Sequence, residues 1–246
     1  MDFQLEICAN SIRSAVAAQQ GGADRIELCD NMAEGGTTPS YGLISLCKKL
    51  LQIPVFPIVR PRGGDFLYLQ EEFEVMKQDV IACHALGCDG VAIGMLNEDG
   101  SIDTERCAEL IALAGPMQVT FHRAFDRCNN LEKGLEDIIR MGCKRVLTSG
   151  GEVYAADAIP VLKKLVHQAN GRISIMPGSG INEENIFRIA KNSGAYEFHS
   201  TGKTFSDSKM KFYRKGNLAQ ADTLFQLVET DPERVQNMRK VLLGMQ

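Results

Sequence analysis

The sequence predicts a single α/β domain over residues 1–246, folded as a TIM (β/α)8 barrel. Eight short apolar segments alternate with eight helical patterns, and such strict alternation requires a parallel sheet whose strands are joined by helices. Similar glycine-containing joints precede the second, fourth, sixth and eighth strands, at residues 22–26, 87–91, 142–146 and 194–198. A repeat of two strand–helix units matches a barrel whose interior layers come from alternate strands. An open doubly wound sheet is the alternative, and eight regular units favour the barrel.

The strands are predicted from short apolar runs, and the helices from apolar residues at helical spacing. The expected strands cover residues 5–8, 26–29, 55–59, 91–95, 118–121, 145–147, 173–176 and 196–198. Asn10 or Ser11 can cap the first helix, which Gly21 ends, and Asp103 caps the fourth. The second helix carries Leu43, Leu46, Cys47 and Leu50. Later helices are expected over about 71–86, 131–141, 155–170 and 183–192.

The end of the chain departs from this alternation. Residues 203–230 show no clear periodicity and exceed the length that a barrel connection needs. We therefore expect an irregular segment that serves as a lid or as an oligomer contact. Asp231 and Pro232 supply an N-cap and a proline at the first helical position, so a C-terminal helix is expected over residues 231–244.

Composition and charge exclude several classes of protein. A net charge of −4 gives no electrostatic reason to bind nucleic acid or an anionic membrane, and no apolar run is long enough to span a membrane. The first strand begins within a few residues of Met1, which leaves no room for a signal peptide. None of the eight cysteines forms a CxxC pair, so free thiols in a reducing compartment are expected. These features predict a cytoplasmic protein.

Polar side chains gather where the strands end. Active sites of TIM barrels lie at the carboxyl ends of the strands. The sequence places there Glu6, Cys8, Glu27, Cys29, Arg60, Arg62, His122, Arg123, Thr148, Ser149, Ser179 and His199. The opposite strand ends show no comparable cluster. We therefore expect a functional pocket at the carboxyl end, and a hydrogen-bonded polar plug is the alternative.

Two strands repeat one pattern. Residues 5–8 and 26–29 both read apolar, Glu, apolar, Cys, so Glu6 shares a face with Cys8, and Glu27 shares one with Cys29. Because a helix lies between them, the two strands are expected to be parallel neighbours. The pattern therefore predicts two carboxylates and two thiols side by side on one face.

Four residues are candidates for acid–base catalysis: Glu6, Glu27, His122 and His199. Two adjacent carboxylates raise the pKa of one of them, which suits acid–base chemistry. The alternative is structural, with each carboxylate paired to Arg60 or Arg123 inside the barrel. Both histidines follow strands, where a base or a ligand would lie, but a histidine there can also be a hydrogen-bonded core residue.

Cys8 and Cys29 are the candidate metal ligands. Soft thiolates select Cu(I) or Zn(II) over hard cations. A closed zinc site would want four nitrogen or sulfur ligands, which only His122 or His199 could complete. The neighbouring glutamates attract a cation but disfavour the thiolate form. Two buried, inert thiols are the alternative interpretation.

Glycine-rich turns follow the last three strands. The turn after strand seven leads into a helix N-terminus, where barrels often hold a phosphate. These turns and three arginines give the candidate binding residues for a small anion: Arg60, Arg62, Arg123, Thr148, Ser149, Gly178, Ser179 and Gly180. No lysine is expected near the carboxyl end of any strand, which argues against a Schiff-base aldolase.

Six segments together resemble the CutC family, which is named for copper homeostasis. They are residues 25–29, 34–40, 60–62, 121–126, 147–151 and 177–181. The resemblance runs from the first strand to the eighth, without departure in these motifs. It implies a single TIM-like barrel in the cytoplasm, commonly a homodimer, with a proposed role in copper handling through Cu(I). Family proposals for copper ligation fall on the strand-end cysteines, which here are Cys8 and Cys29.

The sequence thus leads to different hypotheses about function. In the first, the protein binds Cu(I) at Cys8 and Cys29, with Glu6 and Glu27 nearby. In the second, it is an enzyme that acts on a small anionic or phosphorylated metabolite, because a metal carrier does not need the arginines, His122 and the glycine-rich turns. A scaffold whose dimer surface matters more than its pocket is the third. The residues leave open whether the protein is an enzyme.

Overall fold

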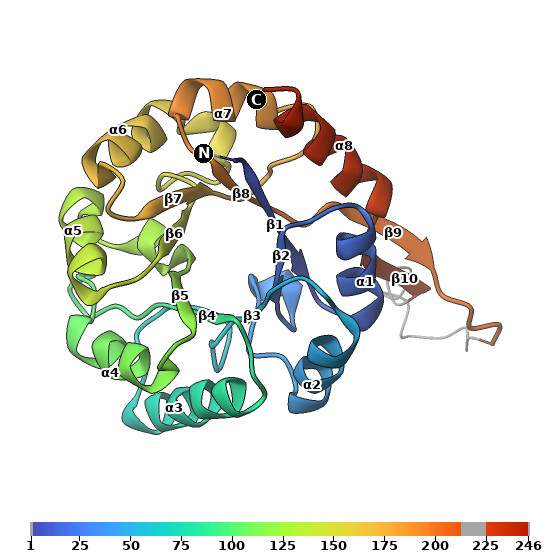
Figure 1. The fold of residues 1–246 in the computed structure, drawn as a ribbon. Coiled ribbons are helices and arrows are strands. Elements are labelled where there is room, and N and C mark those ends of the chain that lie inside the picture. Colours follow the sequence, from blue (N-terminus) through green and yellow to red (C-terminus); the bar gives the residue numbers. More distant parts are fainter. Residues whose placement is uncertain (1, 213–224, 246) are drawn as a thin grey trace, which may run out of the picture.

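The computed structural model describes residues 2–212 and 225–245, in which a central ring of parallel strands is surrounded by helices (Figure 1). The strands of the ring are β1 (Gln4–Ala9), β2 (Arg25–Leu28), β3 (Val55–Pro57), β4 (Gly90–Ile93), β5 (Gln118–Phe121), β6 (Arg145–Thr148), β7 (Ser174–Pro177) and β8 (Glu197–Ser200). The helices are α1 (Ile12–Gln20), α2 (Tyr41–Leu50), α3 (Gln70–Ala85), α4 (Thr104–Ala114), α5 (Leu131–Met141), α6 (Ile159–Ala169), α7 (Ile186–Ser193) and α8 (Pro232–Leu243). The TIM barrel expected from the alternation is confirmed.

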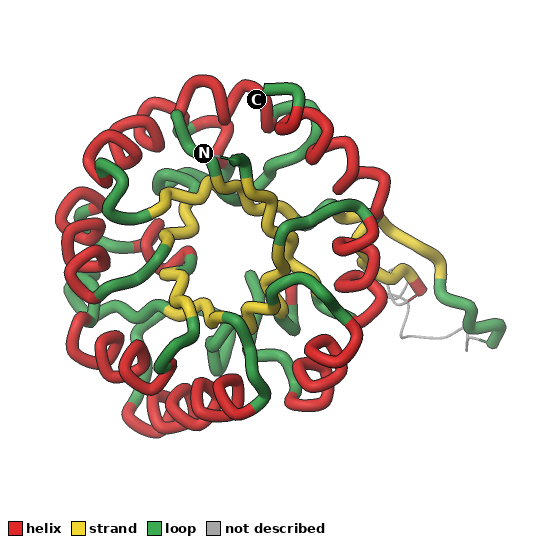
Figure 2. Tube along the Cα trace, viewed as in Figure 1, coloured by secondary structure: helices red, strands yellow, loops and turns green. Residues whose placement is uncertain are grey.

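Two runs of hydrogen-bonded strands make up the ring. One has the order β3-β2-β1-β8 and the other β4-β5-β6-β7. A parallel bridge between Ile58 and Ala92 joins them on the β3/β4 side, and β7 lies beside β8 on the other side (Figure 1). Figure 2 shows the helices as a complete outer layer, in which α8 packs against α1 and α7. The strand order places β8 next to β1, so the first and last strands share one part of the interior.

The pleat sorts the side chains of each strand between two environments. Leu5 and Ile7 of β1 face the helices and belong to the main apolar core, whereas Glu6 and Cys8 face the barrel interior. The main core fills the space between strands and helices, which is the usual arrangement in such barrels. The interior therefore carries the polar groups. Near the carboxyl ends of the strands it also contains a small separate cluster formed by Cys8, Cys29, Ile58 and Ala92.

The helices begin largely at the capping residues that the sequence marks. Ser11, rather than Asn10, caps α1 by accepting a hydrogen bond from the backbone of Ser14, and Asp103 caps α4 in the same way. The sixth and seventh helices begin later than expected, at Ile159 and Ile186. Short turns at residues 155–157 and 182–185 occupy the positions given to their first turns. No helix in the described parts of the chain is long and apolar enough to cross a membrane.

The segment expected to be irregular contains two strands. β9 (Lys203–Asp207) and β10 (Gln226–Thr230) pair antiparallel and extend outward from the barrel beside α1 (Figure 1). Residues 213–224 of this segment lie outside the described residues. The expectation of irregular structure is wrong for the two strands, because nearly all of their residues are exposed or half-exposed and give no strong apolar period. A role as lid or oligomer contact stays a prediction.

Candidate functional site

The strand register brings interior side chains of β8, β1 and β2 together. Glu6 lies opposite His199 of β8 and Arg25 of β2, and Cys8 lies opposite Glu27. Side chains at paired positions of parallel strands point to the same side of the sheet. All five therefore meet inside the barrel, where each is more than nine-tenths buried.

Glu6 is the centre of this network. One carboxylate oxygen accepts a hydrogen bond from Nε of Arg25, and the other lies 2.7 Å from Nδ1 of His199. Burial opposes the charge on Glu6, but Arg25 and His199 outweigh burial, so the pKa of Glu6 lies well below its usual range. The ionised carboxylate fixes the imidazole ring, so that Nε2 of His199 faces Glu27 at 3.8 Å. A carboxylate behind a histidine in this way is the usual support of a metal-binding imidazole.

Cys8, Glu27 and His199 form a compact group. One ligand atom of each lies within 4.8 Å of the other two, and Sγ of Cys8 lies 3.4 Å from Sγ of Cys29. Oε1 of Glu27 is buried and has no hydrogen-bond partner in the described parts of the chain. Two sulfurs, an imidazole nitrogen and a carboxylate oxygen are ligand types that hold soft or borderline metal ions.

The protonation states in this group respond to burial and to one another. Burial raises the pKa of Glu27, although His199 opposes the rise. Burial alone would lower the pKa of His199, but Glu27 and Glu6 outweigh it and the pKa is raised. The hydrogen bond with Cys29, with burial added, raises the pKa of Cys8 well above its ordinary value. Cys8 is therefore a neutral thiol at neutral pH unless a cation stabilises the thiolate.

Cys8, Glu27 and His199 line a pocket of about 450 Å³ at the carboxyl end of the barrel, which we call the mouth pocket. The turns after β7 and β8 form much of its wall. Cys29 is completely buried. It is not among the described residues that line the pocket. Lys203 lines the pocket and has no ion-pair partner among the described residues. The expectation that no lysine lies at this end of the barrel is wrong, because the chain returns here at the start of β9.

His122 belongs to a different environment. It is buried, its Nδ1 accepts a hydrogen bond from the backbone of Ala124, and its ring lies 5.2 Å from that of Phe66. Burial lowers the pKa of His122 to about 3, and the Arg60 charge adds to the effect. His122 is thus a neutral imidazole whose Nε2 has no partner among the described residues. It is absent from the described lining of the mouth pocket, so its catalytic role stays a prediction.

Arg60 and Arg62 hold loops together. The guanidinium of Arg60 is buried and donates to the backbone oxygens of Glu34, Gly36 and Gly64, at 2.8, 2.7 and 2.8 Å. Arg62 is half-exposed and forms ion pairs with acidic residues of its own loop and of α3. Neither side chain is part of the described lining of the mouth pocket. Their assignment to anion binding stays a prediction, and most of their donors already have protein partners.

Thr148 and Ser149 bind a carboxylate of the chain itself. Asp126 accepts hydrogen bonds from Oγ1 of Thr148 and from the backbone of Ser149 and Gly151, the latter two at 3.0 and 3.1 Å. Arg123 donates to the same carboxylate at 2.8 Å while it lines the mouth pocket. An internal anion therefore occupies the donors that the sequence assigns to an external one. Arg123 is the member of this group that remains open to a ligand, because its side chain is 41% exposed.

The turn after β7 has a specific backbone shape. Ser179 adopts a left-handed φ of 76°, and its hydroxyl donates to the backbone oxygen of Val153 at 2.7 Å. A Cβ atom at Gly178 would lie 2.4 Å from the side chain of Leu147, so any larger residue would displace that leucine. Ser179 and Gly180 line the mouth pocket. These positions suit contact with a ligand, and anion binding there stays a prediction.

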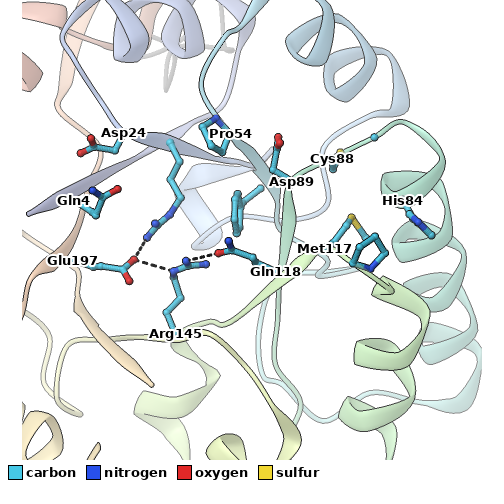
Figure 3. Close-up of a pocket in the computed structure, with 14 residues that line it drawn as sticks. Gln4, Asp24, Pro54, His84, Cys88, Asp89, Met117, Gln118, Arg145 and Glu197 are labelled. Carbon is cyan, nitrogen blue, oxygen red and sulfur yellow. Dashed lines mark hydrogen bonds and ion pairs between the residues drawn. The ribbon is translucent and has the colours of Figure 1, made fainter. Parts of the chain in front are cut away.

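Charged side chains also gather at the amino end of the barrel. A cavity of about 780 Å³ there is lined by Arg25, Arg145, Glu197 and Gln118, among others (Figure 3). Glu197 accepts from both arginines, and Arg145 also donates to Gln118 at 2.7 Å (Figure 3). Both guanidinium groups lie over the ring of Phe56, at 5.6 and 5.2 Å from its centroid. The expectation that this end has no comparable polar cluster is wrong.

Sequence reasoning missed Arg25 and Asp126 as parts of the site. Arg25 lies two positions before Glu27, so the alternation of β2 already places both on one face. Asp126 gives no such signal, because it follows β5 in a short helical turn, and only the fold brings it to the turn after β6. The pattern of a strand therefore reveals its own interior residues, whereas contacts between loops depend on the folded chain.

Comparison with known proteins finds relatives along most of the chain. The model of the CutC family matches residues 3–204. The chain is 46% identical to a human protein named copper homeostasis protein cutC homolog, over 97% of this chain and 89% of that one. It is 47% identical to a CutC family protein of Chromobacterium violaceum, over 98% and 99% of the two chains. A solved CutC structure from Streptococcus agalactiae superposes with a TM-score of 0.78 at 33% identity, covering 81% of this chain and 98% of the other.

Proposed function

Because the chain belongs to the CutC family, we propose that it binds Cu(I) in copper homeostasis, with Cys8 and Cys29 as sulfur ligands and Nε2 of His199 as a nitrogen ligand. The observation that carries the proposal is the pair of Sγ atoms 3.4 Å apart, beside an imidazole and a carboxylate in one pocket wall. Soft thiolates prefer Cu(I) over the hard cations that carboxylates alone would select. The Cu(I) ion is cargo here.

The route to the site runs through the mouth pocket. Cys8 lines that pocket, and Cys29 lies against Cys8, so an incoming ion meets Cys8 first. The carboxylates of Glu6 and Glu27 lie at this end and attract a cation, which then stabilises the thiolate form of Cys8. This order also explains why a fully buried Cys29 can serve as a ligand without its own opening to solvent.

Binding requires the two thiols to lose their protons. Glu27 is the nearest carboxyl group, and its raised pKa makes it a suitable acceptor for the proton of Cys8. The proton of Cys29 leaves to solvent through the mouth pocket, so both thiols ionise as the ion binds. His199 must offer Nε2 without a proton, and the Glu6 contact on Nδ1 fixes that tautomer.

An anaerobic competition titration tests this proposal. Reduced wild-type protein should take one equivalent of Cu(I) from a chromophoric chelator, and the Cys8→Ser/Cys29→Ser variant should lose at least about a hundredfold in affinity, because both thiolates are removed. Cys128→Ser/Cys143→Ser removes two thiols elsewhere and should keep the wild-type affinity. Equal, weak binding by wild type and the Cys8/Cys29 variant would overturn the proposal.

The mouth pocket also favours a second candidate function. Its volume of about 450 Å³ lies in the range of small-molecule sites rather than of single ions. Lys203 and the half-exposed Arg123 offer positive charge at its wall. We therefore keep as the alternative an enzyme that acts on a small anionic or phosphorylated metabolite. Inorganic phosphate should then raise the melting temperature of wild type but not of Lys203→Gln, and equal curves for both would remove the alternative.

We further propose that the protein works in the cytoplasm as a homodimer. Eight cysteines that are all free in the structure suit a reducing compartment. The projecting β9–β10 pair carries exposed apolar side chains, among them Phe205 and Leu227, which a second copy could cover. Light scattering after size exclusion would detect the dimer, and cell fractionation would locate the protein.

A further inference from the structure

One methionine lies in the wall of the mouth pocket near the two thiols. Met32 is half-buried and packs against the cluster that contains Cys8 and Cys29. It also lines the mouth pocket, so one part of the side chain touches the thiol cluster while another faces the opening. The pattern of the strands does not reveal Met32, because it lies in a loop and carries no titratable group.

The loop that carries Met32 is fixed over the thiols. Met32 begins a short turn (Met32–Glu34) after Asn31, which has a left-handed φ of 43°. The backbone at Gly36 has a φ of 89°, and a Cβ atom there would lie 3.3 Å from Cβ of Cys29, so the loop passes directly over that cysteine.

The interaction that holds this loop comes from Arg60. Its buried guanidinium donates to the backbone oxygens of Glu34 and Gly36, on the C-terminal side of Met32. Charge-assisted hydrogen bonds of this kind are stronger than neutral ones. The buried arginine thus fixes the shape of this loop, and the loop packs the Met32 side chain against the cluster that contains both thiols.

We propose that the Met32 thioether is a further ligand of Cu(I), which makes the site selective for this ion. The inference rests on the proposed Cu(I) function of Cys8 and Cys29. A thioether binds soft ions such as Cu(I) and is a poor ligand for the borderline Zn(II), which prefers thiolate, imidazole or carboxylate. It also carries no proton, so its binding is independent of pH. Met32 covers the ion from the side of the pocket, where Cys8 alone would leave it exposed to solvent.

Copper X-ray absorption on selenomethionine-labelled protein tests the contact directly. With one equivalent of Cu(I), the labelled wild type should give a copper–selenium scattering path. Met238→Leu is the matched control, because Met238 also lines the mouth pocket but belongs to the main core rather than to the thiol cluster. The path should persist in Met238→Leu and disappear in Met32→Leu.

Affinity measurements separate this inference from the function on which it rests. Met32→Leu should weaken Cu(I) binding by about tenfold and leave Zn(II) affinity within about twofold, since a thioether contributes to the soft ion alone. Copper–sulfur scattering without copper–selenium scattering in the labelled wild type would overturn the role of Met32 while Cys8 and Cys29 still bind copper. Copper binding that survives in Cys8→Ser/Cys29→Ser would instead overturn the proposed function itself.

Discussion

The two ends of this barrel interior both contain buried polar residues, but these are paired at one end and partly unpaired at the other. At the amino end, Arg25, Arg145 and Glu197 are joined by ion pairs, and all three are more than nine-tenths buried. At the carboxyl end, Oε1 of Glu27 and Nε2 of His122 are buried without partners in the described chain. Buried polar atoms are normally paired, so the unpaired ones indicate where a ligand would supply the missing contact. We therefore infer that one end serves stability and propose that the other serves binding.

Glu6 connects the two ends. Through Arg25 it joins the paired network, and through His199 it supports the binding group. One chain of ion pairs therefore reaches both ends, and the ends differ in whether their buried polar atoms have hydrogen-bond partners. The only unpaired buried side-chain atom that the described chain places at the amino end is the neutral hydroxyl of Ser174, which costs far less than an unpaired charge.

The largest effect is expected from Arg25→Ala. This change leaves the buried carboxylates of Glu6 and Glu197 without their shared partner, and breaking a buried ion pair costs about 3–5 kcal/mol. Urea unfolding should show the loss. The control is Arg13→Ala, which removes an exposed ion pair and should leave the free energy of unfolding nearly unchanged. Similar losses of unfolding free energy in both variants would show that the buried ion pairs stabilise the fold no more than an exposed one.

The same substitution at each end gives the next comparison. Glu197→Gln removes a charge that faces two arginines, and the protein should lose about 2–3 kcal/mol of stability. Glu27→Gln changes a buried carboxyl that forms no ion pair with an arginine among the described residues and whose charge burial already penalises, so the loss should stay below about 1 kcal/mol. The Cu(I) affinity should show the reverse pattern: it should fall in Glu27→Gln and stay at the wild-type value in Glu197→Gln. Equal losses of stability would contradict the assignment of roles to the two ends.

The smallest effect is a dependence of stability on pH through His199. Its pKa in the folded state is raised, because Glu27 and Glu6 outweigh burial. The stabilisation from protonated His199 is therefore fully present below the unfolded pKa of about 6.5 and is lost as the pH rises through the higher folded value. Urea midpoints between pH 5.5 and 8.5 should fall in wild type along this range. His199→Gln should flatten the curve, and an unchanged slope in that variant would assign the effect to another group.

The sequence predicts the barrel well, because alternation of strands and helices is a local property. It also predicts which side chains of β1 and β2 enter the interior, since the pleat alone decides this. The stagger between strands is not local. Cys8, not Glu6, lies opposite Glu27, so the two carboxylates that the repeated pattern places side by side lie in different layers.

Residues at or just after the strand ends are the ones that sequence patterns place least well. Arg60 follows β3, yet its side chain turns into the loop that carries Met32. Thr148 and Ser149 end in contact with Asp126 rather than with the mouth pocket. In each case a hydrogen bond between two loops decides the direction, and such bonds depend on the closed ring rather than on any one segment.

The most direct test of this difference between the ends is to locate the ion. Crystals grown anaerobically with one equivalent of Cu(I) would give an anomalous signal at the copper edge. We expect a single peak between Cys8 and Cys29, beside His199 and Met32. The other cavity also offers a thiol and an imidazole, from Cys88 and His84. A peak there, or no ordered copper at Cys8 and Cys29, would contradict the assignment of binding to the carboxyl end.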